Sequence, residues 1–216
     1  MIQELCIVDV ETTGLDPKSD EITEVGAIQY RIGSGVIASW STRILTEKHP
    51  HAISRMPAVP AARLPARDIA IAWLLRFASR AEAIVAHYAC FDRGFLPELD
   101  GREWICSKTD LDWPNRSGLK LVEIALAHGV PVWRAHRALD DCQLIAALFD
   151  TMGDELSKMI ADARLPRITV MALVSFEENQ KARDAGFEWN TKSKQWLRKM
   201  RRDQIDALPF QYREIS

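Results

Sequence analysis

The chain has 216 residues, of which 47% are hydrophobic and 27% charged, and its net charge at pH 7 is −2. This composition is that of an ordinary globular protein with enough apolar side chains for a core, and it excludes a disordered or fibrous chain. No run approaches the roughly 18 apolar residues that a membrane span needs, and the first residues lack the basic and apolar regions of a secretory signal. We therefore expect a cytoplasmic protein that does not enter a membrane.

The first part of the chain predicts strands at residues 5–10, 24–31 and 36–45, which are rich in β-branched and aromatic residues. The last two are separated by Gly33-Ser34-Gly35, which is typical of a hairpin turn. Short connections between consecutive strands favour an antiparallel meander. The segment that follows, up to Pro65, is rich in proline and alanine and predicts an irregular surface connection.

After residue 66 the pattern changes to strands that alternate with helices. Apolar spacing predicts helices at residues 67–80, 91–96, 119–128 and 138–161, the third ended by Gly129 and the last interrupted at Gly153, with short strands at 83–86 and 104–107. A meander followed by alternating strands and helices predicts an α/β fold with a mixed sheet.

Basic residues gather toward the C-terminal end. From Arg164 onward, 11 basic residues stand against 7 acidic ones, for a net charge of +4, and the preceding part carries −6. Together with Leu165-Pro166, this asymmetry predicts two units, residues 1–163 and residues 167–216. In the second unit we expect a strand at 168–176, a helix at 177–185 and a strand at 195–200, which makes it a small α+β domain.

The four cysteines are scattered, with no C-x-x-C pair among them. Each follows or interrupts an apolar run, where a free cysteine behaves as a small hydrophobe. We expect neither a structural zinc site nor a disulfide framework. The residues are Cys6, Cys90, Cys106 and Cys142.

Two carboxylates end the first predicted strand. Asp9 and Glu11 are two residues apart, so their side chains point to the same face and can share a cation. An isolated D-x-E pair is more often a solvated strand end. Here the pair precedes Thr12-Thr13-Gly14, a turn that can expose backbone N–H groups to a phosphate.

Two further acidic positions follow later in the chain. Asp92 stands at the start of a predicted helix, where a lone acid also serves the helix N-terminus. His136 precedes the last long helix, with Asp140 and Asp141 in its first turn. Taken alone, these four residues are typical of an exposed loop histidine and of acids that complete a helix end.

The three clusters together are more specific than any one of them. Their patterns, D-x-E-T-T-G, H-x-x-x-F-D and H-x-x-x-x-D, in this order, resemble the DEDDh (DnaQ-like) 3′→5′ exonuclease superfamily over residues 4–150. The segments 84–96 and 103–106 are especially similar to its exonuclease X branch. The resemblance implies an RNase H-like fold, a mixed five-stranded sheet flanked by helices. It also implies a phosphodiester hydrolase that uses two Mg²⁺ or Mn²⁺ ions.

The resemblance implies a role for each matched residue. Asp9, Glu11, Asp92 and Asp141 are expected to bind the metal ions, with Asp9 bridging both, and His136 to act as general base. Hard divalent cations prefer carboxylate oxygens, and a pair of them roughly 4 Å apart stabilises the attacking and leaving oxygens of an in-line displacement. An imidazole with an ordinary pKa near 6.5 suits proton removal from water.

The same resemblance implies substrate contacts. This sequence also differs from the family's usual motifs at two places. Backbone amides of residues 11–13, including Thr12 and Thr13, are expected to hold the terminal nucleotide, and Leu15 to wedge against its base. In the family's third motif four residues separate the histidine from the metal-binding acid. Counted from His136, this spacing selects Asp141 rather than Asp140. The family usually has asparagine where Tyr88 stands, and its usual H-G-I-T-like segment is replaced by residues 51–54.

Three functions stay open. The first is removal of nucleoside monophosphates from the 3′ end of DNA, at single-stranded or frayed ends, in repair, trimming or mobile-element processing. The second is 3′ trimming of RNA by the same chemistry. The third is a non-catalytic accessory protein of a polymerase. The expected partners are DNA or RNA with a free 3′ end and a protein of a replication, repair or trimming complex. The sequence leaves the oligomeric state open.

The C-terminal unit carries its own pattern. Gly186-x-x-Trp189-Asn190, followed by Lys194-x-Trp196, resembles a small β-α-β-type module that also stands beside other nucleic-acid enzymes. Between Thr191 and Arg202 there are six basic residues and no acidic one. Basic side chains and aromatics suit phosphate contacts and base stacking, although the two tryptophans also suit the core of a small module.

Overall fold

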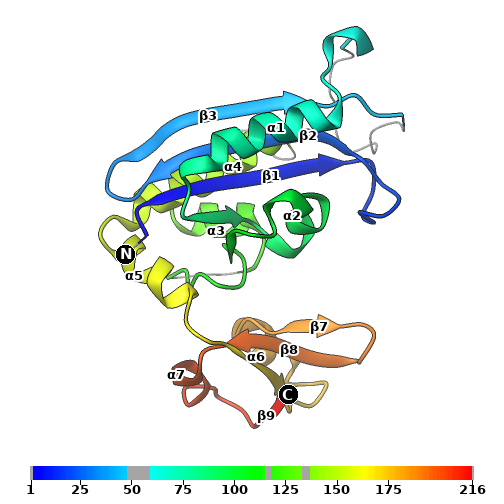
Figure 1. The fold of residues 1–216 in the computed structure, drawn as a ribbon. Helices are drawn as coiled ribbons and strands as arrows, with labels where there is room; N and C mark the ends of the chain where they lie inside the picture. Colours follow the sequence, from blue (N-terminus) through cyan, green and yellow to red (C-terminus); the bar gives the residue numbers. More distant parts are fainter. Residues whose placement is uncertain (1, 48–58, 115–117, 133–136, 216) are drawn as a thin grey trace.

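The computed structural model describes residues 2–47, 59–114, 118–132 and 137–215. Two separate sheets are visible in Figure 1, a larger one formed by the first part of the chain and a smaller one below it. No helix within these ranges is long and apolar enough to cross a membrane.

The larger sheet is mixed and five-stranded, with the strand order β3-β2-β1-β4-β5. The first three strands pair antiparallel, which confirms the predicted meander, and β4 and β5 add to β1 in parallel. The strands are β1 (Glu4–Thr12), β2 (Ile22–Arg31), β3 (Gly35–Arg43), β4 (Ala83–Ala86) and β5 (Glu103–Cys106). Because β1, β4 and β5 are parallel, their carboxyl ends meet at one edge of the sheet.

Helices cover both faces of this sheet because its central strands are apolar on both sides (Figure 1). On β1, Leu5 and Ile7 belong to the core beneath α4, whereas Val8 and Val10 belong to the core beneath α1. Period-two alternation of side chains along the strand produces this division. The helices are α1 (Arg67–Phe77), α2 (Ala89–Phe95), α3 (Leu121–Ala127), α4 (Ala138–Met152) and α5 (Glu155–Ala163), and the short 3₁₀ turns are Ala61–Arg63, Ala78–Arg80 and Pro97–Leu99.

Gly153 divides the long helix that the sequence predicts. Its φ of +52° lies in the left-handed region that favours glycine, so α4 ends at Met152 and α5 begins at Glu155. Another difference concerns Cys90, which is exposed rather than part of an apolar core; the four cysteines are free.

The smaller sheet is four-stranded and antiparallel, in the order β7-β8-β6-β9. The expectation of a β-α-β-type module is wrong, because β6 and β8 pair antiparallel. Three elements, β7, α7 and β9, were not predicted because they are short and mostly exposed, without the apolar run that marks β4. The elements are β6 (Ile168–Ala172), α6 (Asn179–Asp184), β7 (Glu188–Asn190), β8 (Gln195–Met200), α7 (Arg202–Ile205) and β9 (Tyr212–Ile215).

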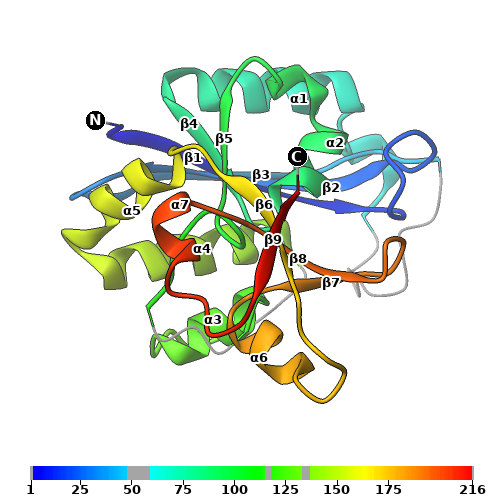
Figure 2. The same cartoon turned by 90° about the horizontal axis from the view of Figure 1, so that it is seen from below.

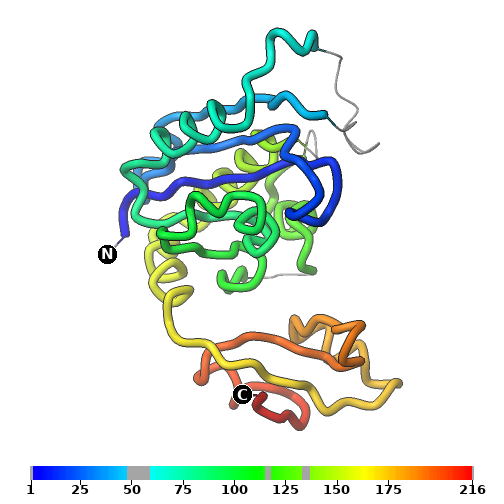
Figure 3. Tube along the Cα trace, turned by 45° about the vertical axis from the view of Figure 1, so that its right-hand side comes forward, coloured from blue at the N-terminus to red at the C-terminus, as the bar shows by residue number. Residues whose placement is uncertain are grey.

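One face of the smaller sheet has its own core. Val170, Phe187, Trp196 and Met200 are buried there. The predicted boundary between residues 163 and 167 falls between the end of α5 and the start of β6, and independent folding of the two units stays a prediction. Figure 3 shows that the chain passes from α5 to the smaller sheet at one side of the molecule.

Ion pairs fasten the smaller unit to the loop that follows β5. Arg201 lies 2.7 Å from the Asp112 carboxylate, and Arg198 lies 3.7 Å from it. Arg167 donates to the backbone carbonyls of Thr109 and Asp110. Figure 2 shows β6 and β8 running beneath the larger sheet. Part of the positive charge that the sequence assigned to nucleic-acid contact therefore serves contact between the units.

Candidate active site

The two acids of the first strand lie on the face that α4 covers. Because side chains alternate along β1, Asp9 and Glu11 continue the row of Leu5 and Ile7, which pack in the core beneath α4. The row changes from apolar to acidic where the strand reaches the carboxyl edge of the sheet. Sequence spacing alone predicts this shared face correctly.

A glycine on the neighbouring strand lets the start of α4 come close. Gly26 pairs with Asp9 in the register of β1 and β2. A Cβ atom at Gly26 would lie 2.5 Å from the backbone carbon of Ala138 and from the backbone nitrogen of Leu139. The first turn of α4 therefore rests directly on the backbone of β2, and this brings Asp141 to the acids of β1.

A buried ion pair fixes the same helix end. Glu24, opposite Glu11 on β2, is almost fully buried, and the Arg137 side chain donates to both of its carboxylate oxygens at 2.9 and 3.1 Å. Arg137 is the residue just before α4. Two parallel N–H···O bonds fix orientation as well as distance, so this pair sets the direction from which α4 approaches β1.

Asp92 reaches the site from the other side of the strand. It lies in the first turn of α2 and is buried, and its Oδ1 accepts a hydrogen bond of 3.1 Å from the Val10 N–H. The paired part of β4 contacts only Leu5 to Ile7 of β1. Beyond Ile7 this side of β1 is free of strand pairing, and the Asp92 carboxylate takes the place of a strand partner.

The structure brings three of the predicted metal ligands together. One carboxylate oxygen each from Asp9, Glu11 and Asp141 lie within 4.8 Å of one another. Asp92 lies against the same stretch of β1, through Val10. Asp140 instead lines a separate hollow beside the start of α4. The spacing of the third motif likewise points to Asp141 rather than Asp140 as the ligand.

The close carboxylates raise one another's pKa values. Burial, followed by the negative charges of Asp92 and Asp141, raises the pKa of Asp9 well above its ordinary value. Burial, with the charges of Asp141 and Glu24, raises the pKa of Glu11 to about 7, against the opposing effect of Arg137.

The pKa of Asp92 is raised as well. Burial raises its pKa to about 8, although the hydrogen bond from Val10 N–H acts in the opposite direction. Like charges that are buried together need a counter-charge. A divalent cation supplies it and favours loss of the protons, and the all-oxygen set is the kind that hard cations prefer. The residues therefore fit a divalent metal site.

The turn after β1 holds the residues expected to contact substrate. Thr12 Oγ1 donates to the Gly14 carbonyl at 2.5 Å. The Thr13 N–H donates to the Glu21 carbonyl across the turn, so it is engaged within the protein. Leu15 is 85% exposed at the tip of the turn, a position from which it can meet a ligand.

The second motif has a structural histidine and a strained neighbour. His87 is hydrogen-bonded at 3.0 Å to the Ser107 hydroxyl and at 3.0 Å to the Leu119 carbonyl, and burial lowers its pKa to about 4. Tyr88 has a φ of +72°. Asparagine tolerates this left-handed conformation far better than tyrosine, which explains why asparagine is usual there.

His136, the expected general base, lies outside the described residues. It directly precedes Arg137, whose ion pair with Glu24 fixes the chain beside the acids. Sequence reasoning missed Glu24, Arg137 and Gly26 as site-building residues. A glycine inside a β-strand signals close approach of another backbone, so Gly26 could have been found; the partnership of Glu24 and Arg137 had no local signal.

The strand order and the position of the acids define the class of this protein. A mixed sheet with the order β3-β2-β1-β4-β5, flanked by helices and carrying a carboxylate cluster on its central strand, is the RNase H-like nuclease fold. The family model described as "Exonuclease" matches residues 6–149. The chain belongs to this exonuclease family. A second model, described as a domain of unknown function (DUF8626), matches residues 168–215.

Curated relatives include both polymerase components and a free-standing nuclease. DNA polymerase III subunit epsilon of Treponema pallidum is 32% identical over 164 residues, 67% of this chain and 74% of that protein. Exodeoxyribonuclease 10 of Escherichia coli K12 is 33% identical over 158 residues, 67% of this chain and 66% of that protein. The PolC-type DNA polymerase III of Thermotoga maritima is 32% identical over 170 residues, and the match spans only 12% of its length.

Solved structures agree with the fold. Exonuclease X in complex with 5′ overhanging duplex DNA matches with a TM-score of 0.57 and 28% identity, over 74% of this chain and 99% of that chain. Exonuclease I of Escherichia coli in complex with a dT13 oligonucleotide matches with a TM-score of 0.61 and 13% identity, over 84% of this chain and 50% of that chain. The second likeness concerns the fold alone.

Proposed function

We propose that this chain is a metal-dependent 3′→5′ exonuclease that hydrolyses phosphodiester bonds from the 3′ end of DNA, at single-stranded or frayed ends, and releases nucleoside monophosphates. The observation that carries the proposal is the meeting of Asp9, Glu11 and Asp141 within 4.8 Å, with Asp92 buried against the same strand. A scaffold without catalysis has no need to gather one buried and three partly buried carboxylates, because their mutual repulsion destabilises the fold.

The four acids hold two Mg²⁺ or Mn²⁺ ions in this proposal. Such ions stabilise the negative charge on the attacking and leaving oxygens of an in-line displacement. When the ions are bound, Asp9, Glu11 and Asp141, whose carboxylates meet, would hold them, and Asp92 would support them from the first turn of α2. His136 accepts the proton of the attacking water, because an imidazole with an ordinary pKa near 6.5 is largely unprotonated at neutral pH.

The turn after β1 positions the terminal nucleotide. The Thr12 and Thr13 segment lies beside the acids, and the exposed Leu15 at its tip packs against the terminal base. Because the Thr13 N–H is engaged with Glu21, Thr12 provides the backbone N–H of this pair. These contacts select a strand end with a free 3′-hydroxyl. Exodeoxyribonuclease 10 and subunit epsilon, whose names denote DNA enzymes, support DNA as the substrate.

Digestion of end-labelled oligonucleotides tests the proposal. DNA and RNA strands of one sequence, labelled at the 5′ or the 3′ end, are incubated with and without Mg²⁺ or Mn²⁺. We expect a 5′-labelled DNA ladder that shortens from the 3′ end only when metal is present, and no ladder with Asp9→Ala. Faster degradation of RNA would replace the DNA assignment with 3′ trimming of RNA, and equal activity of Asp9→Ala would refute the metal site.

The cellular setting is part of the same proposal. The relatives named as polymerase III components support action in the cytoplasm with a protein of a replication or repair complex. Co-purification of the tagged chain from its own cells, followed by identification of bound proteins, tests it. Recovery of a polymerase subunit is expected, and recovery of an RNA-processing complex instead would contradict it.

A further inference from the structure

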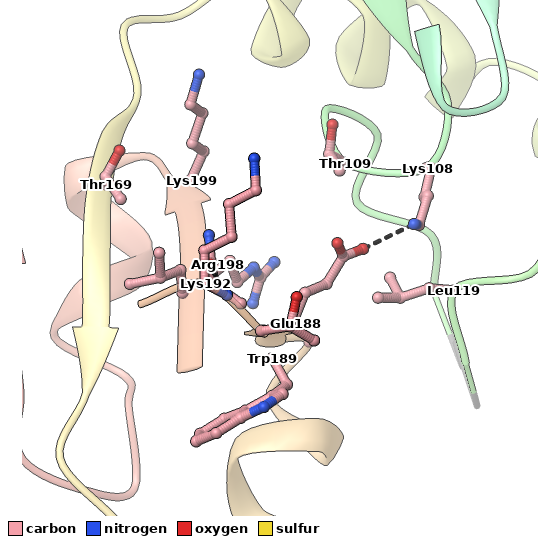
Figure 4. Close-up of a pocket in the computed structure, with 13 residues that line it drawn as sticks. Lys108, Thr109, Leu119, Thr169, Glu188, Trp189, Lys192, Arg198 and Lys199 are labelled. Carbon is pink, nitrogen blue, oxygen red and sulfur yellow. Dashed lines mark hydrogen bonds and ion pairs between the residues drawn. The ribbon is translucent and has the colours of Figure 1, made fainter. Parts of the chain in front are cut away.

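A cavity of about 540 Å³ lies between the two units of the molecule. On one side it is lined by Lys108, Thr109 and Leu119 of the larger unit, and on the other by β7, β8 and the turn between them (Figure 4). We call this cavity the interunit groove. Its volume falls in the range of well-formed ligand sites, roughly 300–1,000 Å³.

The groove opens at the same edge of the larger sheet as the acidic cluster. Asp9 and Glu11 end β1, Tyr88 follows β4, and Lys108 follows β5, and these three strands are parallel. The Lys108 ammonium lies 4.4 Å from the centre of the Tyr88 ring, and Tyr88 directly precedes the helix that holds Asp92. The acids and the groove therefore lie at the same end of the sheet.

The lining of the groove is strongly basic. It includes four basic residues, Lys108, Lys192, Arg198 and Lys199, and one acidic residue, Glu188. Glu188 lies 2.8 Å from the Lys108 ammonium, across the gap between the units. Within the described ranges, Lys192 and Lys199 have no carboxylate within ion-pair distance. Their charge is available to an anionic ligand.

The floor of the groove is the open face of the smaller sheet. Leu197 and Lys199 of β8 point to this face, as does Thr169, the partner of Lys199 on β6. Trp196 and Met200, which alternate with Leu197 and Lys199 along β8, belong to the core on the other face. Figure 4 shows the Trp189 ring pointing away from the lysines. Trp189 belongs to the lining, but beside Lys192 and Lys199 the groove presents amines rather than an aromatic face, which suits phosphates rather than bases.

We propose that the interunit groove binds the phosphate backbone of the single strand that lies 5′ of the nucleotide being removed. Lys192 and Lys199 contact phosphates, and Lys108 exchanges its partner Glu188 for a phosphate when a strand enters. The inference rests on the proposed nuclease function, since the acids at the same sheet edge define where the strand ends. It gives the second unit a role that is independent of base sequence.

Binding of a fluorescent single-stranded oligonucleotide in EDTA, which prevents hydrolysis, tests the groove. We expect the double variant Lys192→Ala/Lys199→Ala to reduce the slope of log K against log salt concentration by about 1.4, since each phosphate contact on a single strand contributes about 0.7. The control Lys158→Ala/Arg202→Ala changes the net charge equally on exposed residues outside the groove, and its slope should match that of the unchanged protein. Equal slopes for both double variants would overturn the proposal.

Substitution of Glu188 gives a second test, in which binding is expected to become tighter rather than weaker. Glu188→Gln removes the competitor of the phosphate for Lys108, so we expect tighter binding, by about two- to fivefold, the worth of one exposed ion pair. Glu214→Gln makes the same charge change beside Arg202, away from the groove, and should not reproduce the gain. Weaker binding by Glu188→Gln, or an equal gain in Glu214→Gln, would contradict the exchange of partners.

A small chromogenic ester, thymidine 5′-(p-nitrophenyl phosphate), separates the groove from the nuclease site because it has no strand to fill the groove. Hydrolysis by the unchanged protein and its loss in Asp9→Ala report on the acids alone. If the ester is hydrolysed while the lysine variant binds strands normally, the groove proposal fails and the nuclease function stands. If the lysine variant loses strand binding but no ester is hydrolysed, the nuclease function fails, and of the groove proposal only the binding of a single strand by the lysines stands.

Discussion

At the scale of single residues, the site depends on carboxylates whose environment opposes their charge. Asp92 is buried and Asp9 and Glu11 are partly buried, and burial raises the pKa of each. The same burial that weakens ionisation without a cation strengthens the attraction to one, since the local dielectric constant is low.

Asp141 and Asp140 provide a matched pair of variants. We expect Asp141→Asn to lower exonuclease activity by at least about 10²-fold, because it removes a carboxylate from the cluster. Asp140→Asn, which lies in the same helical turn but lines another hollow, should stay within about twofold. The rates of release of labelled nucleotides, with Mn²⁺ titrated in both variants, check this. Equal losses of activity in the two variants would contradict the assignment of Asp141 rather than Asp140 as the third metal ligand.

His87 makes stability depend on pH. Its pKa in the folded protein is about 4, below the ordinary value of 6.5, so the unfolded chain binds more protons between these values. The stabilisation is present above pH 6.5 and is lost as the pH falls toward 4. Relative to His87→Gln, the unchanged protein should lose about 2 kcal/mol of unfolding free energy between pH 7.5 and pH 5.

Urea unfolding of the unchanged protein and of His87→Gln at both pH values measures this difference. The comparison removes the contribution of the carboxylates to the pH dependence of stability, because the two proteins share them. A constant gap between them would show that folding does not lower the pKa of His87.

At the scale of elements, one helix end decides the geometry of the site. The first turn of α4 rests on Gly26 and is held by the pair of Arg137 with Glu24. Neither contact touches the reacting bond, yet both determine where Asp141 stands. Precise placement of catalytic groups is worth much more than the strength of any single contact.

Gly26→Ala tests this dependence. The added methyl group would overlap the α4 backbone at 2.5 Å, so we expect a loss of about 1–3 kcal/mol in unfolding free energy. We also expect a fall in activity of about 10²-fold, because displacement of about 1 Å costs that much. Gly101→Ala, where a Cβ meets nothing within 4 Å, is the control for thermal unfolding and activity. Unchanged activity in Gly26→Ala would remove the helix end from the account of the site.

At the scale of the whole molecule, charge places the second unit. The basic C-terminal part divides its residues between two tasks. Arg167, Arg198 and Arg201 contact the loop after β5, while Lys192 and Lys199 line the interunit groove. The first group fixes the orientation that lets the second group face the sheet edge with the acids.

Asp112→Asn should loosen this arrangement, because Asp112 pairs with both Arg198 and Arg201. We expect a loss of about 1 kcal/mol in docking free energy, and hence about fivefold faster proteolysis at the segment between α5 and β6. Asp100→Asn breaks an exposed pair with Arg93 within the larger unit and is the control. Mass spectrometry of the early cleavage products checks the site, and equal rates would show that the units dock by other contacts.

The sequence by itself predicted the five strands of the larger sheet and its main helices, and its resemblance to a family named the acids of the cluster. Period-two and helical spacing are local properties, and D-x-E on a strand places both acids on one face without any tertiary contact. The limits of β4 and β8 were predicted to the residue. The elements that were missed, β7, α7 and β9, are polar and exposed over most of their length, so they carry no apolar run of the kind that marks β4.

Only the tertiary structure decided how these parts meet. The approach of α4 over Gly26, the pairing of Arg137 with Glu24 and the antiparallel order of the second sheet join residues far apart in the chain. The division of the basic residues between docking and the groove depends on which carboxylate lies opposite each of them. Contacts of this kind follow from packing in three dimensions, and no local pattern of residues encodes the partner across the gap.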